Sequence, residues 1–314
     1  MTTPQCSIII RAYNEERHIG RLLQGIQEQG VKDIQVILVD SGSTDRTKEI
    51  AQEYNVEIIE IAPQDFTFGR SLNLGISKAE ASIIVMASAH VYPVYPDWLE
   101  RLLEPFSNQR IGLVYGKQRG APVTHFSEHQ IFHHWYPEHS VSWQSNPFCN
   151  NANAAIRREL WKQHPYDETL PGLEDLEWGK WAQEQGNGIS YIAEAEVIHV
   201  HNESLAGIYN RYKREAMAFK RIYPQETFHL RDLCRLFLHN TVSDWQEARR
   251  QGKFRSNWRK IAGFRWRQFY GTYQGYRQSG PLTWQLKRAF YYPRENATNP
   301  KQPRQRDVQP IQYN

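Results

Sequence analysis

Two stretches of the chain, CSIIIRAYNEERHIGRLLQGI at residues 6–26 and VILVDSGSTDRT at residues 36–47, decide its fold. In the first, an apolar run ends in a polar cluster, and apolar residues then recur at the spacing of a helix. In the second, an apolar run ends on Asp40. The order strand, helix, strand predicts two neighbouring parallel strands joined by a right-handed crossover. Because ligands of open α/β sheets bind beyond the carboxyl ends of the strands, both polar clusters are candidate ligand contacts.

The composition fits one large α/β domain with an appendage, since the chain has 314 residues and 40% of them are hydrophobic. No apolar run approaches the roughly 20 residues that cross a bilayer, and the N-terminus carries no secretory signal pattern. The cysteines, Cys6, Cys149 and Cys234, are odd in number and far apart, which argues against a disulfide framework or a cysteine-based zinc site. We therefore expect a cytoplasmic protein.

Charge divides the chain into two parts. Residues 205–314 carry 22 Lys and Arg against 7 Asp and Glu, a net charge of +15, whereas residues 1–204 carry 16 against 27, a net charge of −11. Such a division indicates two parts with different tasks. The acidic part holds the candidate active site, and the basic part is suited to an anionic surface.

The pattern of strands and helices continues along the chain. Val56–Ala62 is expected to form a third strand, and the continuous apolar run Ala81–Ala89 predicts a central strand buried on both faces. A turn at Gly69 followed by a helix is expected between them. Residues 120–148, rich in His, Trp and Pro, are expected to be irregular, and residues 189–204 to form a pair of short strands.

The motifs RAYNEE and VDSGSTDRT, about 25 residues apart, resemble the nucleotide-binding half of family 2 inverting glycosyltransferases, which have the GT-A fold. The resemblance covers residues 5 to about 204 and implies an α/β fold with an open, twisted, mainly parallel sheet flanked by helices. The helical pattern beyond it predicts a mainly helical C-terminal extension. The expected divisions are a GT-A domain at 1–204 (donor half about 1–117, acceptor half about 118–204), a basic and aromatic extension at 205–291, and a disordered tail at 292–314.

The resemblance implies which residues bind the donor, a nucleotide-diphospho-sugar. It assigns Asp40 to the nucleoside, although Asp40 and Ser43 are alternatively only caps of the next helix. Arg70 and Asn73 resemble the family segment that contacts the nucleoside and the diphosphate, and Arg pairs well with phosphate; the alternative for Arg70 is a solvated cation. The expected donor contacts are Ala12, Tyr13, Asn14, Glu15, Asp40, Ser43, Arg70, Asn73, Ser88, Ala89 and His90.

The chain departs from the family at the metal site. Family members carry Asp-x-Asp after the central strand, which holds Mg²⁺ or Mn²⁺ against the diphosphate, whereas this chain has Ser88-Ala89-His90. The related polypeptide N-acetylgalactosaminyltransferases use Asp-x-His with a second histidine downstream. His199 stands at the matching position, and His201 shares its face on a strand.

Three interpretations of this departure stay open. His90 and His199 hold a divalent cation, for which imidazole favours Mn²⁺ over Mg²⁺. Alternatively, His90, Arg70 or another cation of the protein stabilises the diphosphate without a metal. In the third interpretation, Ser88 and His90 are ordinary polar groups at the end of a strand.

The segment PGLEDLEWGKW carries the candidate catalytic base. The resemblance implies that Asp175 takes the proton from the acceptor hydroxyl and that Glu174 orients the acceptor. A helix N-terminus favours an ionised carboxylate, but acids are common in first turns without any catalytic task. Asn151 and Trp178 are the expected acceptor contacts, although a Trp is more often a core residue.

Residues 120–148 contain five histidines, which suggest either a zinc site or a mobile loop that binds the acceptor, and the absence of a complete ligand pattern favours the loop. These histidines are His125, His129, His133, His134 and His139.

The basic part interleaves Arg and Lys with Trp, Tyr and Phe over residues 211–290. This pattern is typical of a peripheral membrane contact on anionic lipid, of a nucleic-acid surface, or of a helical lid and dimer surface; we expect no nucleic-acid partner. The oligomeric state stays open.

Together these features predict an inverting glycosyltransferase that moves a sugar from a nucleotide-diphosphate donor to a hydroxyl of a glycan or lipid-linked acceptor. A non-catalytic protein that binds sugar nucleotides or glycans is the alternative. A dehydrogenase is disfavoured because no G-x-G-x-x-G follows the first strand.

Overall fold

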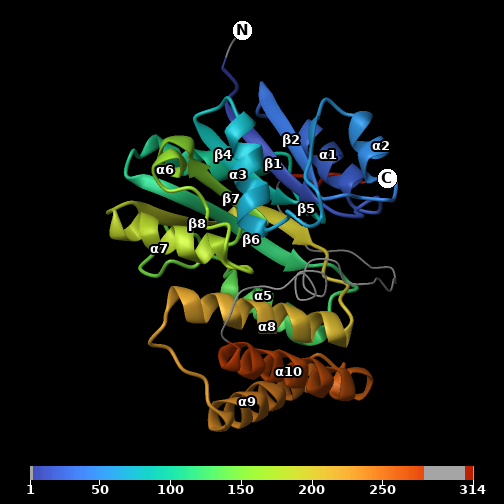
Figure 1. Ribbon diagram of the computed structural model, residues 1–314. Coiled ribbons are helices and arrows are strands. Elements are labelled where there is room, and N and C mark those ends of the chain that lie inside the picture. The colour runs from blue at the N-terminus through green and yellow to red at the C-terminus, as the bar shows by residue number, and fades with distance from the viewer. Residues whose placement is uncertain (1–2, 279–307, 314) are drawn as a thin grey trace.

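The computed structural model describes residues 3–278 and 308–313. A mixed, twisted sheet with the strand order β3-β2-β1-β4-β7-β6-β8-β5 forms the upper part in Figure 1, flanked by helices, and three long helices stack below it. The strands are β1 Cys6–Ala12, β2 Ile34–Asp40, β3 Glu57–Glu60, β4 Ile83–Ser88, β5 Val91–Pro93, β6 Ile111–Gly120, β7 Asn153–Arg157 and β8 Gly188–His199. The helices are α1 Ile19–Gln27, α2 Thr47–Gln52, α3 Phe68–Lys78, α4 Trp98–Leu103, α5 Phe126–Trp135, α6 Arg158–Gln163, α7 Glu174–Glu184, α8 Leu205–Ile222, α9 Leu230–Arg250 and α10 Phe254–Arg277, with a 3₁₀ turn at Glu104–Ser107.

The strand–helix–strand prediction for the first 45 residues is confirmed. β1 pairs in parallel with both β2 and β4, and β2 pairs in parallel with β3. Successive side chains of β1 enter different cores, since Ile9 packs with α3 residues such as Leu72 whereas Ile8 packs with α1 residues such as Leu22. Apolar residues at consecutive positions are therefore needed, because helices cover both faces of these strands.

The second half of the sheet is mostly antiparallel. β7 runs antiparallel to β4 and β6, β8 runs parallel to β6, and β5 runs antiparallel to β8. The expected pair of short strands at 189–204 is wrong, because β8 is one long strand. Its pairing with β6 is irregular between Gly116 and Gln118, so the strand bends without ending.

Two further local expectations are corrected. α3 begins at Phe68, where the Thr67 side chain accepts from the Arg70 N–H at 3.0 Å, so Gly69 lies inside the helix and not in a turn before it. Residues 120–148 are not irregular throughout, since they contain α5. The buried residues of α5 are Ser127, Glu128 and Phe132, so its inner face is largely polar. Apolar residues therefore do not recur at helical spacing, and the sequence pattern does not indicate this helix.

The C-terminal part is helical as predicted. α10 lies along α8 at Gly271 and Gly275, where an added Cβ atom would meet the α8 backbone at Tyr209 and Lys213. A two-pronged ion pair, with Nε–Oδ2 at 2.8 Å and Nη2–Oδ1 at 2.9 Å, joins Arg265 of α10 to Asp244 of α9. Among the described residues, no helix combines the length and the apolar character that crossing a bilayer requires.

The expected tail at 292–314 is described only over residues 308–313. Ile311 donates its N–H to Val94 O at 3.0 Å, and Gln24 of α1 donates to Gln312 O at 3.1 Å. The Tyr313 ring packs edge-on against Tyr92 of β5, with ring centroids 4.9 Å apart. These six residues are therefore held against the edge of the sheet, and residues 292–307 lie outside the described residues.

Candidate active site

The predicted ligand contacts meet at one edge of the sheet. In the strand register, Ala12 of β1 stands beside Asp40 of β2, and Arg11 stands beside Ser88 of β4. β8 ends at His199, which is paired with Val91 just after β4. The polar groups that follow four different strands therefore face the same region beyond the sheet.

The two donor loops predicted from the sequence are bonded to each other. Asn14 donates its N–H to Ser43 Oγ at 2.9 Å and accepts from the Thr44 N–H at 2.8 Å. Glu15 donates its N–H to Thr47 Oγ1 at 2.7 Å. Asn14 adopts a left-handed backbone with φ of 53°, which Asn tolerates better than most residues. The loops after β1 and β2 are thus joined to each other by hydrogen bonds.

Asp40 is fully buried, and among the described residues only one of its carboxylate oxygens has a hydrogen-bond partner. Oδ2 accepts from the N–H groups of Gly42 at 3.0 Å and Ser43 at 2.9 Å. Oδ1 is buried without a hydrogen-bond partner in the described part of the chain. An unsatisfied buried acceptor is costly, so Oδ1 is suited to a ligand N–H or O–H. Asp40 caps the turn and not α2, which begins seven residues later at Thr47.

The structure distinguishes the two α3 residues that were expected to bind the donor. Arg70 is exposed and stays a candidate phosphate contact. The prediction that Asn73 contacts the donor is wrong, because its side-chain amide is fully used within the protein. Its Oδ1 accepts from Trp161 and from the Tyr166 N–H, and its Nδ2 donates to Tyr166 O and to Glu168. Asn73 therefore fixes the loop after α6 and has no group left for a nucleotide.

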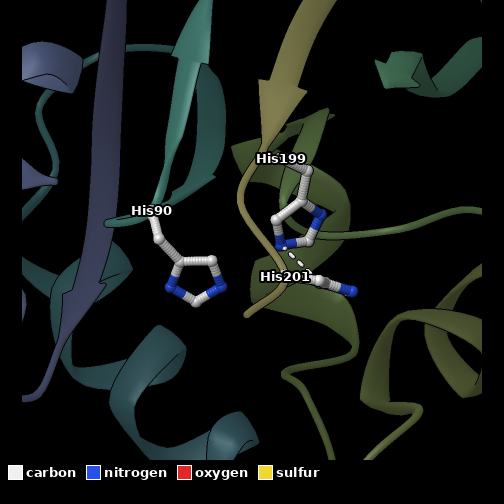
Figure 2. A group of neighbouring side chains, drawn as sticks. All are labelled: His90, His199 and His201. Atoms are coloured by element: carbon white, nitrogen blue, oxygen red, sulfur yellow. Dashed lines mark hydrogen bonds between the residues drawn. The ribbon is translucent and has the colours of Figure 1, made fainter. Parts of the chain in front are cut away.

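Three histidines form a cluster at the ends of β4 and β8, as Figure 2 shows. The His90 and His199 rings stack with centroids 5.0 Å apart, and the Nε2 atoms of His199 and His201 lie 2.9 Å apart. Each ring offers one nitrogen to a group within 4.8 Å. Two nitrogens about 2.1 Å from one metal ion, at a right angle, are separated by roughly 3 Å. The spacing of His199 and His201 fits that arrangement.

An oxygen acceptor holds the Nδ1 atom of each of these rings. The partners, all at 2.7 Å, are Glu15 Oε1 for His90, Gln118 Oε1 for His199 and Glu128 Oε1 for His201. These acceptors assign the proton of a neutral ring to Nδ1 and leave the Nε2 lone pair toward the cluster, as in most histidine metal sites.

The pKa values of the two neighbouring histidines, His90 and His199, are shifted in opposite directions. Burial, together with His201 and His90, holds the pKa of His199 well below its ordinary value, so His199 is neutral. Burial also opposes the charge of His90, but the Glu15 carboxylate outweighs it and raises the pKa of His90. His90 thus favours a neighbouring anion such as a diphosphate even without a metal.

Sequence reasoning missed the residues that support the cluster. Glu128 of α5 is buried and accepts from Arg211 of α8 at 2.5 Å as well as from His201. Burial disfavours its charge, but Arg211 and His201 overcome this and lower the pKa of Glu128 to about 2. Arg211 also donates to Glu203 at 2.8 Å. No sequence motif indicates Glu128, because its partners His201 and Arg211 are more than 70 positions away in the sequence.

The Glu174–Asp175 pair stands at the start of α7, as predicted. Glu174 is buried and accepts from Arg11 Nη1 of β1 at 2.9 Å. Asp175 accepts from the N–H groups of Asn151 at 3.1 Å and Leu176 at 2.8 Å. Burial and the adjacent Glu174 charge raise the pKa of Asp175 to about 7, which is a range suited to a general base.

The backbone before the pair is unusual, since Leu173 has a φ of 54°. Left-handed backbone is rare for a branched residue and often marks functional sites. Asn151 is buried, and besides its N–H contact to Asp175 its side chain lies 3.5 Å from Glu174. Asn151 therefore positions the Glu174–Asp175 pair.

The prediction that Trp178 contacts the acceptor is wrong. Its ring is fully buried and its Nε1 donates to His164 O at 2.8 Å, so Trp178 offers no face to a sugar.

Comparison with known proteins gives one family. The model of glycosyl transferase family 2 matches residues 7–164. The O-antigen chain rhamnosyltransferase WbaN of Salmonella anatum is 27% identical over 225 residues, which cover 67% of this chain and 70% of WbaN. The glycosyltransferase AglE of Haloferax volcanii is 26% identical over 211 residues, which cover 64% and 67% of the two chains.

Solved structures agree with this fold. The mannosyltransferase PcManGT from Pyrobaculum calidifontis, in complex with GDP-Man and Mn²⁺, has a TM-score of 0.59 and 18% identity, covering 94% of this chain and 89% of that one. S. aureus TarS 1-349 in complex with UDP has a TM-score of 0.52 and 16% identity, covering 87% and 90%. The predicted GT-A fold is confirmed.

Proposed function

Because the chain belongs to glycosyl transferase family 2 and is a glycosyltransferase, we propose that it transfers a sugar from a nucleotide-diphosphate donor to a hydroxyl group with inversion at the anomeric carbon. The observation that carries this proposal is the carboxylate pair of buried Glu174 and half-buried Asp175, with the pKa of Asp175 raised to about 7, at the same sheet edge as the donor loops. A non-catalytic binding protein would need no carboxyl group with its pKa raised toward neutrality.

The donor would lie across the loops after β1 and β2. Asp40 Oδ1 would accept from a base N–H or a ribose hydroxyl, since it is a buried acceptor without a partner in the described residues. Arg70, exposed on the first turn of α3, would contact a phosphate. These contacts hold the nucleotide while the sugar extends toward α7.

The histidine cluster would hold a divalent cation. His90, His199 and His201 would supply the ligands, and three imidazoles favour Mn²⁺ over Mg²⁺. Such a cation, when bound, neutralises charge on the departing diphosphate. The Mn²⁺ complex of PcManGT, which shares the fold, supports this assignment.

The chemical step would use Asp175 as the general base. The acceptor oxygen would attack the anomeric carbon as the bond to the phosphate oxygen breaks, and its proton would pass to the Asp175 carboxylate. Glu174, held by Arg11, would keep the negative charge next to Asp175 and orient the acceptor. Single displacement of this kind inverts the anomeric configuration and needs no covalent intermediate.

The relatives support a polysaccharide acceptor. WbaN is named an O-antigen chain rhamnosyltransferase, and the structural neighbour PcManGT a mannosyltransferase. We therefore propose a hexose or 6-deoxyhexose donor and a glycan or lipid-linked glycan acceptor for this chain.

The outer helix pair, α9 and α10, would contact an anionic membrane surface. Leu238, Val242, Trp258 and Trp266 on these helices are exposed apolar side chains. The exposed cations on the same helices are Arg231, Arg235, Arg249, Arg250, Arg255, Arg259, Lys260, Arg267 and Arg277. Aromatic side chains among cations suit the headgroup region of anionic lipid, which is also where a lipid-linked acceptor would lie.

The test is release of nucleoside diphosphate from UDP-, GDP-, dTDP- and CDP-sugars, each with Mn²⁺ and with EDTA. Release from one donor class, with opposite anomeric configurations of donor and product by NMR, is the expected result. No release from any donor would overturn the catalytic proposal, and retention of configuration would overturn the single displacement.

A further inference from the structure

One face of α5 runs from the histidine cluster toward the catalytic base. Glu128 bonds to His201, and one turn later the Phe132 ring lies 5.4 Å from the His201 ring. Another turn later the Trp135 ring stacks on Phe148, with centroids 4.3 Å apart and an interplanar angle of 27°. Residues spaced by three and four positions share a helix face, so α5 lines the region between the cluster and Phe148.

Phe148 connects this helix face to the base. The next residue, Cys149, donates its Sγ–H to the Asp175 backbone oxygen at 3.2 Å, and Asn151 donates its N–H to Asp175 Oδ2 at 3.1 Å. The stacked pair of Trp135 and Phe148 is therefore joined to the base by a short, hydrogen-bonded segment.

Trp135 is 46% exposed even though Phe148 covers part of its ring. An indole held flat by a second aromatic ring loses little conformational entropy when a ligand stacks on it. The C–H groups on one face of a pyranose ring are apolar and pack well on such a surface. A Trp side chain is more often buried in the core, as Trp178 is. Trp135 differs, because about half of its fixed indole remains accessible to another molecule.

We propose that Trp135, backed by Phe148, is the platform on which a pyranose ring of the acceptor stacks beside Asp175. This inference rests on the proposed function and refines its acceptor class to a saccharide end. The platform does not suit an acceptor that offers only an aliphatic lipid hydroxyl or the hydroxyl of a Ser or Thr side chain, since none of these has an apolar ring face to place on the indole.

Trp143 provides a matched control. It is 45% exposed and belongs to the same connection between α5 and β7, and its ring is covered by the Arg110 guanidinium 4.8 Å away. It packs on Gly188, the first residue of β8, whereas the cluster residue His199 ends that strand. A strand advances about 3.3 Å per residue, so Trp143, at the opposite end of β8, is far from the histidine cluster.

The experiment measures binding of methyl α-L-rhamnopyranoside, methyl α-D-mannopyranoside and methyl β-N-acetylglucosaminide by saturation-transfer NMR, with donor nucleotide and Mn²⁺ present. The wild type should bind at least one of them. Trp135→Ala should weaken binding at least tenfold, Trp135→Phe should weaken it less, and Trp143→Ala should bind like the wild type. Melting temperatures identify any variant that fails to fold. If Trp135→Ala fails to fold, weaker glycoside binding by Trp135→Phe is the test of the platform.

The inference is overturned if the wild type binds none of the three glycosides, or if Trp135→Ala and Trp135→Phe bind as the wild type does. Donor hydrolysis by the wild type tests the proposed function separately. Hydrolysis without glycoside binding would sink the platform alone, whereas Trp135-dependent binding without hydrolysis of any donor would sink the enzymatic proposal alone.

Discussion

His199 and His201 lie with their Nε2 atoms 2.9 Å apart at the end of β8. Their Nδ1 atoms are held by Gln118 and Glu128, so a direct N–H···N bond would require one ring to give up this assignment or to become charged. The low pKa of His199 disfavours a charge there. A divalent cation shared by the two lone pairs would satisfy both rings without either change.

We therefore expect His199→Ala and His201→Ala to abolish the effect of Mn²⁺ on the melting temperature. Glu128→Gln should weaken Mn²⁺ binding about tenfold, because outer partners tune histidine ligands to that extent. His139→Ala, at an exposed position outside the cluster, is the control. The metal interpretation is wrong if the wild type shows no stabilisation by Mn²⁺, and the metal-free interpretation with His90 as the cation then gains support.

Asp175 should control the pH dependence of transfer. A base with a pKa of about 7 is protonated and inactive at lower pH, so kcat/KM should rise with pH up to about 7 and then level off. Asp175→Asn should lower kcat by at least about 100-fold with nucleotide affinity retained. Glu177→Gln, in the same first turn but paired with His164, is the control; equal losses in both variants would mean that Asp175 is only a helix acid.

Substitution of the two charged neighbours of Asp175 should shift the rising limb of the plot of kcat/KM against pH in opposite directions. Glu174 raises the pKa of Asp175 and Arg11 lowers it, so Glu174→Gln should move the limb to lower pH and Arg11→Ala to higher pH. Arg11→Ala should also destabilise the fold by about 3 kcal/mol, because it leaves a buried carboxylate without its partner. Shifts in the same direction would contradict the electrostatic account, and chemical denaturation measures the stability term.

The sequence was sufficient for the parts of the site that local chain order determines. The end of β2 at Asp40, the end of β4 at Ser88, two residues before His90, and the start of α7 at Glu174 follow from periodicity and motif spacing. The direction of a side chain does not follow from periodicity or motif spacing. The predicted roles of Asn73 and Trp178 were wrong for that reason. Each turns toward groups that only the tertiary fold brings near, Tyr166 for Asn73 and His164 O for Trp178. Glu128 was missed for the same reason.

Asp40 offers a clean test of the donor site. Asp40→Asn can keep its turn, because the amide oxygen still accepts from Gly42 and Ser43 while the NH₂ group replaces Oδ1, which has no partner within residues 3–278 and 308–313. That exchange turns an acceptor into a donor, so nucleotide affinity should fall about tenfold with little change in melting temperature. Calorimetry with UDP, GDP, dTDP and CDP measures it, and Asp65→Asn, at an exposed position, is the control. Unchanged affinity would remove Asp40 from the donor site.

The outer helix pair should bind anionic vesicles through both charge and aromatic burial. We expect the protein to float with phosphatidylglycerol vesicles at low salt, to float less with phosphatidylcholine alone, and to lose binding as salt screens the charges. Replacing Trp258 and Trp266, each more than 40% exposed, by Ala should weaken binding even at low salt, because their burial among the headgroups is lost. The Trp143→Ala variant, with an equally exposed indole elsewhere, controls for general hydrophobicity. Equal flotation with both lipids would contradict the role of charge. No flotation with either lipid would argue against a membrane surface and favour the helical lid or dimer interpretation, which sedimentation of the same variants would then distinguish.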